Sequence, residues 1–260
     1  MLTVLASGKA APGVTTATWA LALSWPGPLL VADCDPAGGD MVPGMLAGRV
    51  GIDHGLLSWS TAARHDLPVA GAAALLAEHG IQVPEQPQMT LVPGFATAMQ
   101  GSSFTLDAWE RLARALQRST ASLGRDALVD AGRLVSDRSC WPVLRAADQV
   151  LLTVRPSVRS VHAAQDAVRR LRQQLGDLTT VTALVVGDGP YSAGEVAEAL
   201  ELPLVGVLPE DRAAATVLSD GGRMSVKAMR RSSLMRAATS LASKLAASAE
   251  SSSDVAAVAG

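Results

Sequence analysis

Residues 7–16 read Ser7-Gly8-Lys9-Ala10-Ala11-Pro12-Gly13-Val14-Thr15-Thr16, two glycines and a pair of threonines between an apolar run and a segment of helical period. The apolar run, residues 2–6, predicts a short buried strand, and residues 15–24 predict the helix after it. A glycine-containing turn from a buried strand into a helix is typical of α/β proteins. We therefore expect a strand–loop–helix unit here.

The same alternation of short apolar runs and longer helical segments continues along the chain. Further strands are predicted at 29–32, 127–129, 150–154, 181–186 and 204–208, and further helices at 105–118, 158–175 and 195–200. This pattern predicts an α/β fold, a mostly parallel sheet with helices on both faces. Residues 43–93 are irregular and predict no clear element. We expect a single domain over residues 1–249 and a disordered tail over 250–260.

Composition narrows the class of protein. The 260 residues are 48% apolar and 18% charged, with a net charge of −2, which excludes disorder throughout and gives no bulk attraction to nucleic acid. Two cysteines, Cys34 and Cys140, are too few for a disulfide framework or a zinc site. Pro26, Gly27 and Pro28 interrupt the most apolar early segment, so no transmembrane segment is expected. These features favour a cytoplasmic protein.

The loop after the first predicted strand has the glycine spacing of a phosphate-binding loop. Such loops wrap backbone N–H groups around an anion at a helix N-terminus, use a lysine on the outer phosphates, and bring a threonine hydroxyl to Mg²⁺. Here the lysine position is Val14. From this loop alone, nucleotide binding and a turn without a ligand are equally open.

Carboxylates follow two other predicted strands. Asp33 and Asp35 end the strand at 29–32, and Asp130, two residues before Gly132, ends the strand at 127–129. Ligands of parallel sheets bind at such strand ends, where carboxylates can hold the water shell of a metal ion or position an attacking water. Each acid alone also fits a helix cap or a turn. The glycine loop and both acidic strand ends together indicate a phosphate and Mg²⁺ site.

These residues resemble the ParA/MinD family of P-loop ATPases, whose deviant Walker A motif reads Lys-Gly-Gly-x-Gly-Lys-Thr-Thr. The resemblance extends from residue 1 to about residue 222 and is weakest between 43 and 105. It implies a P-loop NTPase fold, ATP and Mg²⁺ as cofactors, a face-to-face homodimer and a protein partner in a positioning or secretion system. The most similar branch is TadZ/CpaE, which localises pilus or secretion machinery and includes members with altered Walker loops.

The resemblance also implies roles for individual residues. Lys9 corresponds to the signature lysine that reaches the partner's nucleotide, and Asp35 to the acid that helps activate the attacking water. Thr15, Asp33 and Asp130 correspond to the residues that hold the metal. The nucleotide contacts implied are Gly8, Lys9, Ala10, Ala11, Gly13, Val14, Thr15, Thr16, Gly132, Pro209 and Asp211.

The loop departs from the family motif in ways that disfavour anion binding. Ala10 and Ala11 replace two glycines, and Val14 replaces the lysine, whose charge-assisted contact is worth about 1.5 to 3 kcal/mol, or about 10- to 150-fold in affinity. Lys9 could supply the missing charge across a dimer. Two hypotheses therefore stay open, an ATPase that positions cellular machinery and a pseudo-ATPase scaffold that binds protein partners.

A third hypothesis comes from the end of the chain. Residues 221–249 contain six basic residues and no acidic one, a pattern that fits non-specific DNA binding by a partitioning protein or a solvated last helix. Residues 250–260 lack the bulky apolar side chains of an amphipathic membrane anchor. The basic residues expected to contact DNA are Arg223, Lys227, Arg230, Arg231 and Arg236.

Overall fold

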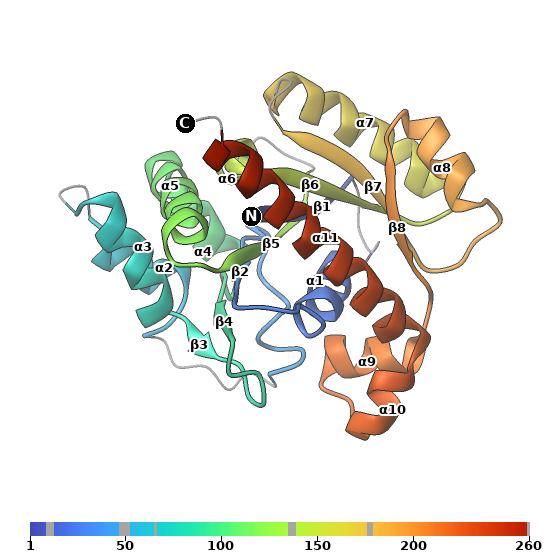
Figure 1. Ribbon diagram of the computed structural model, residues 1–260, viewed down its shortest axis with the longest axis horizontal. Helices are drawn as coiled ribbons and strands as arrows, with labels where there is room; N and C mark the ends of the chain where they lie inside the picture. The colour runs from blue at the N-terminus through green and yellow to red at the C-terminus, as the bar shows by residue number, and fades with distance from the viewer. Residues whose placement is uncertain (9–12, 47–52, 65–66, 135–138, 176–178, 259–260) are drawn as a thin grey trace.

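The computed structural model describes residues 1–260 except 9–12, 47–52, 65–66, 135–138, 176–178 and 259–260. Its strands form one sheet in the order β3-β4-β2-β5-β1-β6-β7-β8, and all neighbours are parallel except β3 and β4 (Figure 1). The strands are β1 (Leu2–Ser7), β2 (Leu29–Asp33), β3 (Ile81–Gln82), β4 (Met89–Val92), β5 (Asp126–Arg133), β6 (Gln149–Val154), β7 (Thr180–Val186) and β8 (Leu204–Leu208). The predicted α/β fold with a mostly parallel sheet is confirmed.

Helices cover both faces of the sheet. One face packs against α2 (Leu56–Ala62), α3 (Val69–Glu78), α5 (Leu106–Ser122), α6 (Trp141–Ala146), α7 (Val158–Leu175) and α8 (Ala193–Leu200). The other packs against α1 (Val14–Ala22), α9 (Arg212–Asp220) and α11 (Ser233–Val258). Two short helices, α4 (Ala98–Ser103) and α10 (Val226–Arg231), complete the described elements.

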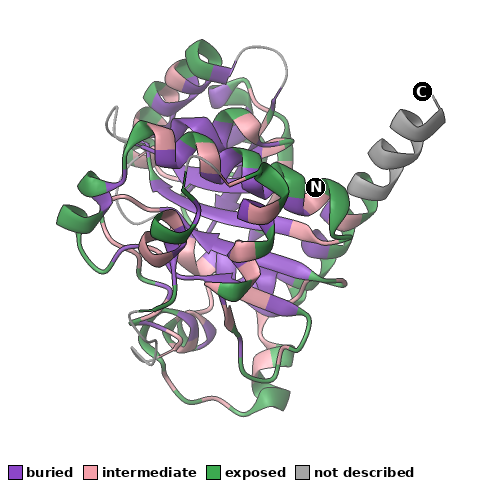
Figure 2. Cartoon of the chain, turned by 90° about the vertical axis from the view of Figure 1, so that its left-hand side faces the viewer, coloured by how far each residue is buried: buried purple, intermediate pink, exposed green. Residues whose placement is uncertain are grey.

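The central strands are apolar throughout because both of their faces are covered. In β1, Val4 lies in the core under α5 to α8, while the next residue, Leu5, lies in the core under α1 and α11, and both are fully buried. Such runs are typical of parallel sheets between two helical layers. Figure 2 shows these buried strands between helices whose outer surfaces are exposed.

The irregular segment at 43–93 contains α2, α3, β3 and β4, which the sequence did not predict. Trp59 of α2 is fully buried, and its indole N–H donates to the backbone oxygen of Ala72 in α3 at 2.9 Å. Contacts between elements, rather than local periodicity, therefore stabilise this segment. At the other end, α11 continues to Val258, which covers most of the predicted tail; the division into domain and tail stays a prediction.

Within the described part of the chain, none of the helices combines the length and the apolar character needed to cross a bilayer.

The order of the strands brings the predicted site together. β5 lies between β1 and β2, and Asp130 is in register with Leu5 on one side and Asp33 on the other. The carboxyl ends of β1, β2 and β5, which carry the loop and the acids, therefore meet at one edge of the sheet.

Candidate functional site

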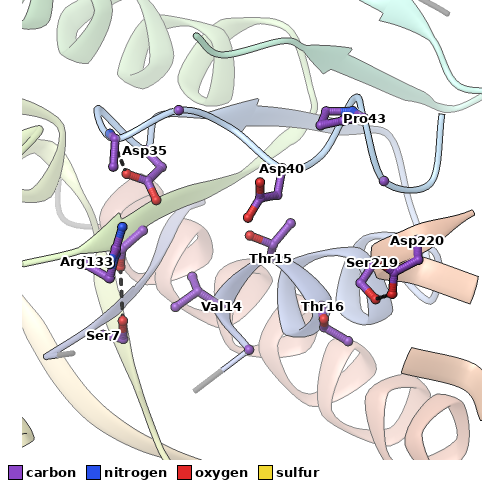
Figure 3. Close-up of a pocket in the computed structure, with 15 residues that line it drawn as sticks. Ser7, Val14, Thr15, Thr16, Asp35, Asp40, Pro43, Arg133, Ser219 and Asp220 are labelled. Carbon is purple, nitrogen blue, oxygen red and sulfur yellow. Dashed lines mark hydrogen bonds between the residues drawn. The ribbon is translucent and has the colours of Figure 1, made fainter. Parts of the chain in front are cut away.

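A cavity of about 780 Å³ lies at this edge, between the N-terminus of α1 and the ends of β2 and β5 (Figure 3). Its size is within the range of small-molecule sites. It combines predicted residues with others that the sequence did not single out. The lining residues are Ser7, Gly13, Val14, Thr15, Thr16, Asp35, Ala37, Gly38, Asp40, Pro43, Gly44, Gly132, Arg133, Ser219 and Asp220.

The N-terminus of α1 faces the cavity. Gly13 precedes the helix in the left-handed conformation, with φ of 74°, and as a glycine it brings no side chain of its own to cap the helix. The first N–H groups of a helix lack intrahelical partners and carry partial positive charge, so they attract anions. Lys9, Ala10 and Ala11 lie outside the described residues.

Val14 occupies the position where the family motif has lysine. Its side chain is 6% exposed and packs in the core with α11, while the residue also lines the cavity. The helix therefore offers its partial charge and two threonines, Thr15 and Thr16, but no full positive charge at this position.

Asp130 lies below the cavity and holds Thr15. Its carboxyl is 1% exposed and accepts hydrogen bonds from the Thr15 hydroxyl and, at 2.8 Å, from the Gly132 N–H. Burial raises the pKa of Asp130 to about 6, the negative charges of Asp35 and Asp40 add to the rise, and the two hydrogen bonds oppose it. Asp130 therefore positions Thr15 at the start of α1, and the role of Thr15 as a metal ligand stays a prediction.

Asp33 lies deeper than the sequence suggests. It is 1% exposed, does not line the cavity, and accepts a 3.4 Å hydrogen bond from the backbone N–H of Asp35. Burial and the charge of Asp130 hold the pKa of Asp33 well above its usual value. A Cβ on Gly39 would overlap this carboxyl, so the loop after β2 packs directly on it. Its role as a metal ligand stays a prediction.

Of the two acids singled out after β2, Asp35 is the one that lines the cavity. One of its oxygens accepts a 2.8 Å hydrogen bond from the Ala37 N–H, and burial raises its pKa, against the lowering effects of that hydrogen bond and of the positive charge on Arg133. Gly132 has φ of 59°, and a Cβ there would overlap the Asp35 carboxyl. Glycine is therefore required at 132 by both the backbone and the approach of Asp35.

A second, smaller cavity of about 100 Å³ adjoins the first and shares Gly13 and Thr16 with it. Pro209 and Asp211 line this second cavity, and their contact with a nucleotide stays a prediction. The Asp211 carboxyl accepts hydrogen bonds from the N–H groups of Ala214 and Ser233, both at 3.1 Å, and so connects α9 to α11. Asp211 therefore also has a structural role.

Gly8 lines neither cavity. It is half-buried, and a Cβ at this position would overlap the backbone oxygen of Ala163 in α7. The glycine is needed for packing between the end of β1 and α7, and its contact with a nucleotide stays a prediction.

Sequence reasoning missed several lining residues. Arg133 directly follows the motif around Asp130, so a cation after an acidic strand end was the available signal. Asp40 lies in the loop after β2, with its carboxyl facing the Thr15 hydroxyl in Figure 3. Ser219 and Asp220 come from the end of α9, and no sequence signal connects them to the loop.

The described residues contain no group of three or more His, Cys, Asp or Glu side chains placed to hold a metal ion. Mg²⁺ commonly uses one or two protein ligands together with substrate phosphates and waters. Any Mg²⁺ here would therefore need the ligand's own oxygens.

The predicted DNA-binding residues lie apart from both cavities. All of them are exposed: Arg223, Lys227, Arg230, Arg231 and Arg236.

No protein-family model and no curated protein matches the chain. Solved structures do. A MinD from Pyrococcus horikoshii OT3, complexed with Mg-ADP, superposes with a TM-score of 0.72 at 16% identity, over 94% of this chain and 95% of that one. A ParA family ATPase from Chlorobium tepidum TLS gives 0.71 at 17%, over 93% and 96%.

A third similar structure is the MinC:MinD cell division complex of Aquifex aeolicus, with a TM-score of 0.70 at 16% identity over 95% of each chain. At these identities the likeness concerns the fold. The chain therefore has the P-loop NTPase fold of the MinD and ParA ATPases.

Proposed function

We propose that this chain is a ParA/MinD-like protein that binds a nucleotide with Mg²⁺ in the larger cavity. The observation that carries the proposal is the convergence of the N-terminus of α1, Thr15 and Asp35 on one cavity, with Asp130 bonded to Thr15 beneath it. Enzymes of phosphoryl transfer use this set of groups: a helix N-terminus binds phosphate, a hydroxyl binds the metal ion, and an acid orients the attacking water.

The residues of this chain fit such a ligand in two parts. The larger cavity presents the polar groups that suit phosphates and Mg²⁺, and the smaller cavity, which shares Gly13 and Thr16, adjoins it on the side where we place the nucleoside. Mg²⁺ would neutralise phosphate charge when bound. Asp130 orients the Thr15 hydroxyl toward that position, and Asp35, fixed by Ala37, holds its carboxylate at the cavity wall, where it can orient a water.

The buried acids favour a ligand-binding protein over a scaffold. Asp33 and Asp130 are each 1% exposed, and burial raises the pKa of both, so their ionised forms destabilise the folded chain. A scaffold would be more stable with neutral residues here. Carboxyls kept at such a cost are typical of functional sites.

The cellular role follows by analogy. The similar structures are named as a septum site-determining protein and as a complex of two cell division proteins, MinC and MinD. We therefore infer that this chain positions cellular machinery through a protein partner and dimerises to do so, with a TadZ/CpaE-like role in pilus or secretion systems as the specific form. The alternative is a pseudo-ATPase scaffold on the same fold.

The exposed basic residues of α10 and its surroundings support another candidate, a partitioning protein that holds DNA non-specifically. Residues 221–249 contain six basic residues and no acidic one, and such a surface attracts phosphate backbones in a salt-dependent way. The net charge of −2 for the whole chain opposes it, so nucleotide binding is the main proposal.

The test is a calorimetric titration of the purified full chain with ATP and ADP, in Mg²⁺ and in EDTA. We expect ATP and ADP to bind saturably, with a Kd below millimolar, in Mg²⁺. Thr15→Ala should weaken this binding about 10-fold or more, because the variant loses the contact of the Thr15 hydroxyl with the charged metal ion. In EDTA, the wild type and Thr15→Ala should bind alike, since the hydroxyl acts through the metal.

Thr120→Ala is the matched control, because the Thr120 hydroxyl bonds only within α5, to Gln117 at 2.9 Å. It should bind as the wild type does. Absence of saturable binding below millimolar in the wild type would remove the nucleotide proposal and leave the scaffold.

A further inference from the structure

The charges around the larger cavity are unbalanced for an anionic ligand. Its described lining residues include three acids, Asp35, Asp40 and Asp220, and one cation, Arg133. A nucleoside triphosphate brings several further negative charges, which repel carboxylates across a short distance. A binding site for it therefore depends strongly on whatever positive charge the cavity supplies.

Arg133 is held at the position where the missing charge is needed. It is the last residue of β5 and is in register with Ser7 at the end of β1, where the loop begins. Its backbone oxygen accepts from the Ser139 hydroxyl at 3.3 Å, and the next N–H, of Leu134, donates to Ser7 at 2.8 Å. Both bonds are made by the peptide group between Arg133 and Leu134, so they fix the backbone on the C-terminal side of Arg133.

The side chain of Arg133 is available to a ligand. It is exposed, lines the cavity, and forms no ion pair within the described part of the chain. Figure 3 places it beside Asp35 and Ser7, on the opposite side of the cavity from Ser219 and Asp220. Its charge reaches into the site, since it lowers the pKa of Asp35 against the larger effect of burial.

Val14, in contrast, cannot serve as a cation and packs into the core from the start of α1. We propose that Arg133 neutralises the outer phosphates of the nucleotide from the end of β5, in place of the phosphate-loop lysine that Val14 replaces. This inference rests on the proposed nucleotide binding. A guanidinium suits the task because its planar donors can bond two phosphate oxygens at once.

The test compares ATP, ADP and AMP binding, each with Mg²⁺, in the wild type and in Arg133→Gln. We expect Arg133→Gln to weaken ATP binding about 10-fold or more, ADP binding less, and AMP binding by less than about twofold, because only the longer ligands carry outer phosphates. Arg133→Lys should retain part of the ATP affinity, since it keeps the charge and loses the planar contact.

Arg118→Gln is the matched control, an exposed arginine on α5 that lines neither cavity, and it should bind all three nucleotides as the wild type does. Thermal unfolding of each variant identifies any loss of fold. Val14→Lys introduced into Arg133→Gln should restore ATP affinity, because it returns a cation to the same phosphates.

The experiment distinguishes a failure of the role of Arg133 from a failure of nucleotide binding itself. Wild-type ATP affinity in Arg133→Gln, or an equal loss for ATP and AMP, would overturn the role of Arg133 while nucleotide binding stands. Failure of the wild type itself to bind would overturn the proposed function instead. A loss graded from ATP to AMP and rescued by Val14→Lys is the supporting result.

Discussion

The two walls of the larger cavity are built differently. On the loop wall, a Cβ added to Gly13 would meet no atom of the described residues closer than the Thr16 Cβ at 3.9 Å, and the position of the usual lysine is the apolar Val14. On the acid wall, a Cβ on Gly132 would overlap Asp35, and Asp130 is bonded on two sides. The acid wall is thus fixed by packing, whereas the described part of the loop wall leaves space at Gly13 and carries no charge at Val14. In the proposed site, the side that would take metal and water therefore depends on the fold, and the side that would take the anion depends on which cation is present.

The largest expected effect comes from an alanine substitution at one glycine of each wall, Gly132 on the acid wall and Gly13 on the loop wall. Gly132→Ala combines a positive φ, disfavoured by about 1 to 2 kcal/mol, with an overlap of the kind that costs about 1 to 3 kcal/mol more. Gly13→Ala, with φ of 74° and no close contact among the described residues, should lose only the first amount. Denaturant unfolding of both variants measures the difference.

Gly132→Ala should also displace Asp35 and lower any ATP hydrolysis, whereas Gly27→Ala, with open space and no positive φ, is the neutral control. Equal stability losses at 132 and 13 would contradict the contrast between a packed and an open wall.

The second prediction has a somewhat smaller expected effect and concerns the buried carboxyl of Asp130 on the acid wall. The pKa of Asp130 in the folded chain is about 6, above its ordinary value of 3.8, so the folded state binds the proton more tightly than the unfolded state. Its contribution is therefore most favourable below about pH 4 and is lost as pH rises through 6, by about 3 kcal/mol in all. Asp130→Asn should be more stable than the wild type at pH 7 without ligand and should lose this pH dependence.

Unfolding measured from pH 4 to pH 8 checks this, with Asp188→Asn as the control, because Asp188 is exposed. The same Asp130→Asn variant should bind Mg²⁺ and nucleotide more weakly, since Thr15 loses its charged partner. A variant less stable than the wild type at pH 7 would mean that the ionised carboxyl stabilises the fold.

The smallest expected effect concerns the loop wall. Val14→Lys should tighten ATP binding about 10-fold by restoring a phosphate contact, and should lower stability by about 1 to 2 kcal/mol because Val14 is a buried core residue. Val14→Met, similar in length and uncharged, separates the charge from the change in packing. Unchanged ATP affinity in Val14→Lys would indicate that the alanines at 10 and 11 have closed the loop.

Local sequence patterns alone predicted much of the architecture. Apolar runs such as residues 150–154 predicted buried parallel strands, and the observed β6 covers the same segment, because a strand covered on both faces has a nearly continuous apolar sequence. The glycine loop and the acids at strand ends also located the cavity edge, since Gly13, Thr15 and Asp35 all line it. Local patterns did not predict the helices and strands of residues 43–93, because contacts such as that of Trp59 with Ala72 form only after folding.

The tertiary structure decided what each charged residue does. Asp33 and Asp35 look equivalent in sequence, yet of the two only Asp35 reaches the cavity, because Asp33 is the last residue of β2 and is covered by the following loop, whereas Asp35 lies beyond the strand. Likewise, Arg133 and Asp220 are distant in sequence and meet at one cavity because strand order and helix packing bring the ends of β5 and α9 together. Sequence periodicity reports how an element is buried, whereas the environment of a charge depends on neighbours that only the fold supplies.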